Sequence, residues 1–189
     1  KAINKLYNMK IKVLIIGLGN IGMMYDIKNK NAKLTHTKSF FANSKFNLIG
    51  GVDNSPIKLK IFENKYRIKG YKSVHEALKY LIPDLIVVST NTDFHLKTIK
   101  EIFKSKFKNK VIFCEKPGGK SLREINEINK ICKFNNCKIF FNYMRISQKS
   151  TRILFKHLNN IKGYIKGVAY YKNSLLNDAS HFINLFQFI

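Results

Sequence analysis

The sequence predicts an α/β fold built on a doubly wound parallel sheet, followed by the beginning of a smaller α+β domain. The first observation is a regular alternation of short apolar runs with amphipathic segments. The second is a glycine-rich turn directly after the first apolar run. Short β-branched runs separated by helical patterns are typical of parallel strands whose connecting helices cover both faces of a sheet.

Five short apolar runs are expected to form the strands of this sheet. They are rich in valine and isoleucine, as strands buried on both faces usually are. In chain order the predicted strands are Ile11–Ile16, Leu48–Val52, Leu85–Val88, Val111–Cys114 and Lys138–Phe141.

Two segments between these runs have the apolar spacing of amphipathic helices. Helix starts are expected at Ser73 and Ser121, because each serine is followed three residues later by a glutamate, the pattern of a capping box. In the segment after Leu85–Val88, the residues that share one face are Leu96, Ile99, Ile102 and Phe103. In the segment that follows Ser121, they are Leu122, Ile125, Ile128 and Cys132.

The pattern changes after about residue 145. We expect a leader at residues 1–8, a nucleotide-binding domain at 9–145, and at 146–189 the beginning of an incomplete C-terminal substrate or oligomerisation domain. In this last part, Tyr164–Tyr171 alternates like an antiparallel strand with one wet face, between helical patterns at Thr151–Leu158 and Ser180–Phe188. One strand and one helix cannot bury their apolar faces alone, so the chain is expected to stop inside a second domain.

Composition narrows the class of protein. The chain has 189 residues, 45% of them hydrophobic, which is too apolar for a disordered protein. No apolar stretch approaches the roughly 18–20 residues that span a bilayer, so a transmembrane protein is not expected. The three cysteines, Cys114, Cys132 and Cys137, lack the C-x-x-C spacing of a zinc site. We therefore expect no metal and free thiols in a reducing cytoplasm.

The net charge of +24 raises nucleic acid as a partner. However, nearly all of the basic residues are lysines spread along the chain, whereas phosphate and base recognition favours arginine. Lysine, asparagine and isoleucine all have A/T-rich codons, so a biased genome explains the excess better than a specific nucleic-acid partner does. A general attraction for anionic substrates remains in either case.

The first predicted strand runs into Gly17-Leu18-Gly19-Asn20-Ile21-Gly22. This G-x-G-x-x-G turn brings backbone amides and a helix N-terminus against a pyrophosphate, as in Rossmann domains. Because it follows a strand and opens an expected helix, we interpret Gly17, Gly19, Asn20, Ile21 and Gly22 as cofactor-binding. The alternative is a glycine turn without a ligand.

Asp53 follows the second predicted strand, where a carboxylate can bind the hydroxyl groups of the adenosine ribose. It lies farther from the glycine turn than usual, and the polar stretch Lys28–Lys38 accounts for this as an insertion. A carboxylate repels a 2′-phosphate, so NAD is favoured, while Lys58 and Lys60 leave NADP open. Alternatively, Asp53 caps the following helix.

Polar residues follow the predicted strand that ends at Val88. Thr90, Asn91 and His95 are candidate cofactor contacts, because ligands bind at the carboxyl ends of parallel strands. The same residue types are also ordinary helix caps.

Glu115-Lys116-Pro117 follows the next strand, at the same predicted edge of the sheet. The proline keeps Lys116 out of helical geometry and stiffens the turn. Glu115 and Lys116 are therefore candidate cofactor contacts, and the lysine can polarise or protonate a substrate oxygen beside the cofactor. Taken alone, the tripeptide is better explained by a solvated lysine in a turn.

These elements, together with Asn177–His181, occur in the order found in the Gfo/Idh/MocA oxidoreductases, the family of glucose–fructose oxidoreductase and inositol dehydrogenase. The chain resembles this family from Met9 onward, and the Glu-Lys-Pro element is the most telling match. A bacterial subgroup found with surface-polysaccharide and sugar-nucleotide biosynthesis is similar in four further segments: Tyr25-Asp26, Leu34-Thr35-His36, Asn142-Tyr143-Met144-Arg145 and Ser180-His181-Phe182-Ile183-Asn184.

The resemblance implies a Rossmann domain followed by a largely antiparallel sheet domain that shapes a sugar pocket. It implies that Lys116 lies beside the substrate hydroxyl, that His181 is a general acid/base, and that Asn177 acts with them. Arg145, Asn177 and His181 are the implied substrate contacts. The implied activity is NAD(P)-dependent oxidation of a sugar or sugar-nucleotide alcohol in the cytoplasm by a protein that is a homo-oligomer when full length.

The chain departs from the family pattern at several positions. Asn177 and Asn184 stand where aspartates are usual, Ala179 where glycine is usual, and Asn91 replaces a common proline. Asparagine can orient a hydroxyl but cannot take up a proton, so proton transfer is expected to fall on His181 and Lys116. Three alternatives stay open: an interior role for His181, a truncated and inactive nucleotide-binding fragment, and a basic nucleic-acid-binding module.

Overall fold

The computed structural model describes residues 9–29, 31–164, 166–172 and 175–187, without the side chains of 176 and 177. The predicted leader at residues 1–8 lies outside these residues. The chain divides into two compact units, residues 1–140 and 141–189, which are described separately. Within the described residues, no helix combines the length and the apolar character needed to cross a membrane.

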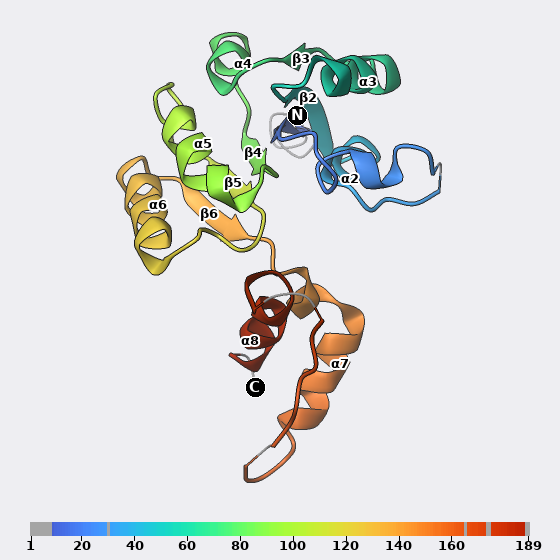
Figure 1. Cartoon of the computed structure of the whole chain (residues 1–189), viewed down its shortest axis with the longest axis vertical. Coiled ribbons are helices and arrows are strands. Elements are labelled where there is room, and N and C mark those ends of the chain that lie inside the picture. The colour runs from blue at the N-terminus through green and yellow to red at the C-terminus, as the bar shows by residue number, and fades with distance from the viewer. Residues whose placement is uncertain (1–8, 30, 165, 173–174, 188–189) are drawn as a thin grey trace, which may run out of the picture. The chain divides into compact units, whose positions relative to one another are not determined.

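The first unit is built on a six-stranded sheet with strand order β3-β2-β1-β4-β5-β6 (Figure 1). Parallel pairs join β1 to β2 and to β4, β2 to β3, and β4 to β5. This confirms the predicted doubly wound α/β fold. The strands are β1 (Ile11–Ile16), β2 (Phe46–Val52), β3 (Gly70–Tyr71), β4 (Leu85–Val88), β5 (Val111–Cys114) and β6 (Lys138–Phe141).

Helices connect these strands, and both predicted capping boxes form. The side chains of Ser73 and Ser121 accept the amides of Glu76 and Glu124, while each glutamate carboxylate accepts the amide of the residue before the serine. The α-helices of the first unit are α2 (His36–Phe41), α3 (Pro56–Tyr66), α4 (Val74–Tyr80), α5 (His95–Ile102) and α6 (Leu122–Phe134), and its 3₁₀ helices are η1 (Met24–Asp26) and η2 (Thr92–Phe94).

The core lies between the sheet and its helices. Val13, Ile15 and Phe62 are fully buried within one apolar cluster. On α6, Ile128 is fully buried, but Leu122 is 72% exposed, so the apolar face predicted to start at Leu122 is buried only farther along the helix. The three cysteines are buried free thiols, as expected, and burial raises the pKa of Cys132 to about 12.

The glycine turn does not open a full α-helix, which corrects the prediction. The turn is followed directly by the short 3₁₀ helix η1. The carbonyl of Ile21 accepts the amide of His36, and the carbonyl of Gly22 accepts both the amide and the hydroxyl of Thr37. These acceptors are therefore used by α2, which itself begins inside the stretch Lys28–Lys38 that was interpreted as an insertion.

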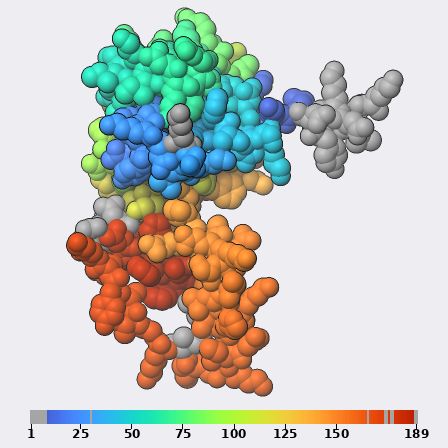
Figure 2. Space-filling model, turned by 90° about the vertical axis from the view of Figure 1, so that its right-hand side faces the viewer, coloured from blue at the N-terminus to red at the C-terminus, as the bar shows by residue number. Residues whose placement is uncertain are grey.

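The second unit is helical in its described part, with η3 (Met144–Ser147), α7 (Lys149–Leu158), the π-helical η4 (Leu175–Ala179) and α8 (Ser180–Phe186). The strand predicted at Tyr164–Tyr171 is not formed by the described residues of that segment. Tyr164 and Tyr170 are almost fully exposed, and this orange-red segment lies at the surface in Figure 2. An alternating sequence needs a neighbouring strand to form a ladder, and the described residues provide none here.

Candidate active site

The turns that follow four strands lie along one edge of the sheet. The amide of Gly17 donates to Val52 at the end of β2, and the amide of Ser89 donates to Ile16 at the end of β1, each at 2.8 Å. The amide of Glu115 donates to Val88 at the end of β4, also at 2.8 Å. The edge therefore presents, in order, the turns after β2, β1, β4 and β5, and the strand order reverses between β1 and β4, where ligands of such sheets bind.

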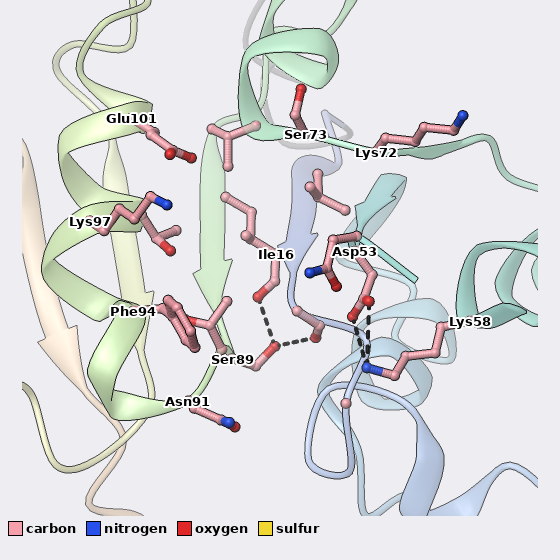
Figure 3. Close-up of a pocket in the computed structure, with 17 residues that line it drawn as sticks. Ile16, Asp53, Lys58, Lys72, Ser73, Ser89, Asn91, Phe94, Lys97 and Glu101 are labelled. Atoms are coloured by element: carbon pink, nitrogen blue, oxygen red, sulfur yellow. Dashed lines mark hydrogen bonds and ion pairs between the residues drawn. The ribbon is translucent and has the colours of Figure 1, made fainter. Parts of the chain in front are cut away.

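A crevice of about 460 Å³ opens at this edge (Figure 3). Five of the predicted cofactor contacts line it: Gly17, Gly19, Asp53, Thr90 and Asn91. The lining also includes residues that were not predicted, among them Lys58, Lys72, Ser89 and Lys97. The other predicted contacts, Asn20, Ile21, Gly22, His95, Glu115 and Lys116, do not line this crevice.

The three glycines of the turn differ in what a side chain at each position would meet. Gly17 has a φ of +95°, and a Cβ there would lie 2.7 Å from the backbone of Ser89 and Thr90. A Cβ on Gly22 would lie 2.0 Å from the carbonyl oxygen of Gly17. Gly19 differs, because no atom lies within 4 Å of the place a Cβ would take. The fold thus requires Gly17 and Gly22, whereas Gly19 keeps the backbone open toward the crevice.

The amides of this turn are available to a ligand. The amide of Leu18 donates to Asp53 Oδ2 at 2.8 Å. Within the described part of the chain, the next three amides, those of Gly19, Asn20 and Ile21, donate to no protein acceptor. Successive unpaired amides form a concave donor set that suits phosphate oxygens. The chemistry of these donors therefore fits the predicted pyrophosphate.

Asp53 is buried and points toward the glycine turn. Besides Leu18, it accepts the amide of Ser55 at 2.9 Å, and the Lys58 ammonium lies 3.3 Å from its Oδ2 (Figure 3). The cap of α3 is Ser55, whose hydroxyl accepts the amide of Lys58. Asp53 thus supports the start of the helix without being its cap, and its carboxylate remains at the crevice.

Ser89 begins the polar segment that was expected to contact a ligand, although it was not itself among the predicted cofactor contacts. Its hydroxyl donates toward the carbonyls of Ile16 and Gly17, at 3.1 and 2.8 Å, and so ties the end of β4 to the start of the glycine turn (Figure 3). Its place directly after a buried strand was the available signal.

His95 is fully buried, and this corrects the expectation that its side chain contacts the cofactor. Its Nε2 donates to the carbonyl of Thr90 at 3.0 Å. Burial lowers the pKa of His95 because it disfavours the imidazolium, and backbone groups of Thr90, Pro117 and Gly118 oppose the shift only in part. The ring therefore lies between the turn after β4 and the turn after β5.

Stability is expected to depend on pH through His95. Its pKa is lowered in the folded state, so the unfolded chain binds the proton more readily below its ordinary value of 6.5. The contribution of His95 is therefore complete above about pH 6.5 and is lost as the pH falls, by at most about 1.4 kcal/mol per pH unit. Thermal unfolding between pH 8 and pH 5 should show a steeper loss for the wild type than for His95→Gln, which keeps a donor to Thr90. Parallel profiles for the two proteins would contradict this role.

The Glu-Lys-Pro turn follows β5, and its Lys116–Pro117 peptide bond is cis. Glu115 is buried, and its Oε1 accepts His36 Nε2 at 2.7 Å. Its Oε2 accepts the amide of Lys116 at 3.3 Å, while the Lys116 side chain is partly exposed. His36 is a second residue whose contact with the site was not predicted.

The remaining predicted residues lie in the second unit. The ring of His181 meets that of Tyr143 edge-to-face at 5.9 Å, and the exposed Arg145 guanidinium lies 5.3 Å from the ring of Phe182. Burial raises the pKa of Tyr143, partly opposed by a hydrogen bond with Ser180. The structure thus places Arg145 and His181 on the contacting elements η3 and α8. Asn177 lies in η4, and its side chain is outside the described residues.

Solved structures share this fold. Scyllo-inositol dehydrogenase from Lactobacillus casei, with bound NAD(H) and scyllo-inositol, is 17% identical, with a TM-score of 0.74 over 95% of this chain and 56% of that one. Myo-inositol 2-dehydrogenase from Lactobacillus plantarum is 21% identical, with a TM-score of 0.66 over 80% of this chain and 42% of that one. WlbA dehydrogenase from Bordetella pertussis, with NADH and UDP-GlcNAcA, is 16% identical, with a TM-score of 0.67 over 80% of this chain and 40% of that one.

At these identities the likeness concerns the fold, and this chain spans only about half or less of the length of each of these proteins. No curated protein matches the sequence. The family model described as an oxidoreductase family with an NAD-binding Rossmann fold matches residues 11–143, which is most of the chain. The chain therefore belongs to the Gfo/Idh/MocA oxidoreductase family.

Proposed function

We propose that the protein is an NAD(P)-dependent oxidoreductase that acts on an alcohol carbon of a sugar or sugar nucleotide. The observation that carries this proposal is that the amides of Gly19, Asn20 and Ile21 donate to no acceptor among the described residues, beside the buried carboxylate of Asp53. Membership of an NAD-binding oxidoreductase family supports the same cofactor.

The order of the turns along the edge sets the expected direction of the cofactor. The amides after Gly19 would hold the pyrophosphate, and Asp53, after β2, would bind the adenosine ribose. A dinucleotide that extends from there across β1 and β4 directs its nicotinamide toward β5. Thr90 and Asn91 would flank its middle, and Glu115 and Lys116 would lie at the reacting end.

When bound, the cofactor supplies the group that accepts or returns a hydride. The proposed tasks of the chain's own residues are to move the hydroxyl proton and to hold the substrate. His181 would exchange that proton, since histidine titrates near neutrality, and the Lys116 ammonium would polarise the substrate oxygen. Asn177 would orient the hydroxyl by a hydrogen bond, and Arg145 would bind an anionic part of the substrate.

The substrate class is supported by the ligands in structures with the same fold, scyllo-inositol in one and UDP-GlcNAcA in another. The net charge of +24 favours an anionic substrate, and of these two classes the sugar nucleotide is the anionic one. We place the protein in the bacterial cytoplasm, in polysaccharide or sugar-nucleotide biosynthesis, as a homo-oligomer when full length.

Gly19→Val tests whether the glycine turn binds the cofactor. No described protein atom lies within 4 Å of the place its Cβ would take, so the melting temperature should stay within about 2 °C of the wild type, because surface changes have small effects on stability. The new side chain would, however, occupy the space above the amides of the turn. Calorimetric titration with NADH should show at least a tenfold weaker affinity. Equal affinity in the variant and the wild type would contradict a phosphate at this turn.

Lys58 provides a test of cofactor choice. Its ammonium lies 3.3 Å from Asp53, where it offsets the carboxylate that would otherwise repel a 2′-phosphate. Lys58→Ala is expected to raise the ratio of the NADPH to the NADH dissociation constant at least fivefold. Lys60→Ala, an exposed lysine on the same helix, is the matched control and should leave the ratio unchanged. The same ratio in both variants would exclude this role for Lys58.

A second candidate is nucleotide binding without turnover. The asparagines at 177 and 184, where the family pattern has aspartates, favour it, because an asparagine cannot take up a proton. A saturable NADH complex that forms no NADH from NAD with any inositol or UDP-sugar tested would support this candidate over the enzyme.

A further inference from the structure

One residue joins two turns of the proposed cofactor site, the glycine turn and the Glu-Lys-Pro turn. The backbone amide of His36 donates to the carbonyl of Ile21 in the glycine turn. The ring of the same residue donates from Nε2 to Glu115 Oε1 at 2.7 Å, across 79 positions of sequence. The two side chains are about nine-tenths buried, and the ring also meets Phe113 edge-to-face.

The backbone that carries His36 is firmly held. The buried carboxylate of Asp26 accepts the amides of Leu34 and Thr35 and the hydroxyl of Thr35, at 2.7 to 3.0 Å. On the other side of His36, both the amide and the hydroxyl of Thr37 donate to the carbonyl of Gly22. The start of α2 is therefore fixed to the glycine turn, and the imidazole extends from that fixed point to β5.

Glu115 also holds the next residue in place, because its second carboxylate oxygen accepts a hydrogen bond from the amide of Lys116 at 3.3 Å. An ionised carboxylate can only accept, so His36 must donate from Nε2. One short, buried side-chain bond thus holds the distance between the glycine turn and the Glu-Lys-Pro turn, in addition to the backbone hydrogen bonds along the sheet edge.

We propose that His36 is a positioning residue that sets this distance and so aligns the nicotinamide half of the bound dinucleotide. The inference rests on the proposed function, in which the adenosine half lies over β2 and the nicotinamide half lies toward β5. It predicts that His36 matters for NADH and not for ADP-ribose, which has the same diphosphate and adenosine but lacks the nicotinamide ring.

Calorimetric titration of the full chain with NADH and with ADP-ribose tests this prediction. His36→Phe keeps an aromatic ring beside Phe113 but removes the donor to Glu115. We expect at least a tenfold weaker NADH affinity and an ADP-ribose affinity within twofold of the wild type. His36→Gln keeps an amide donor and should restore the NADH affinity to within threefold. His75→Phe, at an exposed histidine of α4, is the matched control and should change neither affinity.

Equal weakening of both ligands by His36→Phe would overturn the inference, since it would mean general damage to the domain. Unchanged affinity for both ligands would also overturn it. His36→Leu, which also lacks the donor to Glu115, supplies a second measurement if His36→Phe does not fold, and it should reproduce the selective loss of NADH affinity. Failure of the proposed function looks different, because the wild type would then bind neither ligand.

Discussion

Lys116→Ala is expected to lower kcat at least 100-fold while the dissociation constant of NADH changes less than threefold. General acid–base groups typically contribute factors of 10² to 10⁴, and here the lysine would act on the substrate oxygen instead of holding the cofactor. His181→Ala should behave in the same way. Initial rates of NAD reduction, measured with the inositol or UDP-sugar on which the wild type is active, together with NADH titration, provide the measurement.

Lys120→Ala is the matched control for this experiment, because Lys120 is an exposed lysine just after the same turn. Its surface ion pairs with Asp93 and Glu124, at 3.8 and 3.9 Å, contribute little to stability. Its turnover should equal that of the wild type. If turnover is unchanged in both Lys116→Ala and His181→Ala, neither residue has the proposed role.

Gly22→Ala is expected to cause the largest loss of stability. The added Cβ would lie 2.0 Å from the carbonyl oxygen of Gly17, and Gly17 is itself held against the backbone of Ser89 and Thr90. Neither backbone can move without breaking hydrogen bonds at the sheet edge. We expect a loss of about 3 kcal/mol or more and a fall in melting temperature of roughly 10 °C.

The control for Gly22 is Gly167→Ala, at a position in the second unit where no atom lies within 4 Å of the added Cβ. Thermal unfolding followed by circular dichroism compares the two variants. A melting temperature for Gly22→Ala equal to that of Gly167→Ala would show that the close approach of Gly22 to Gly17 is absent in solution.

Much of the fold follows from local sequence patterns. The five predicted strands all form: β4 is largely buried, whereas β6 is only partly buried, with Phe140 53% exposed. The strand β3 escaped prediction since Gly70 and Tyr71 are too few residues to create a pattern. The helix expected after the glycine turn is replaced by η1, because its carbonyl acceptors are taken by α2, a competition that periodicity does not reveal.

Some residues of the candidate site were also predictable from the sequence, and others were not. Gly19 and Asp53 were predictable, because a strand followed by a turn already places them at the crevice. His36 was not, because its significance arises from a contact with Glu115 that only the folded sheet creates. His95 has the residue type of a ligand contact, yet burial gives it a structural task.

Hydrogen–deuterium exchange of the full chain, with and without NADH, tests most directly whether one dinucleotide lies across this edge of the sheet. We predict slower exchange on NADH binding in peptides that cover residues 17–22, 53–58, 89–91 and 115–117, and unchanged exchange in the last turn of α6, at the helix end away from this edge. Protection that is absent from residues 17–22, or that appears only outside these four segments, would contradict a cofactor site at the glycine turn.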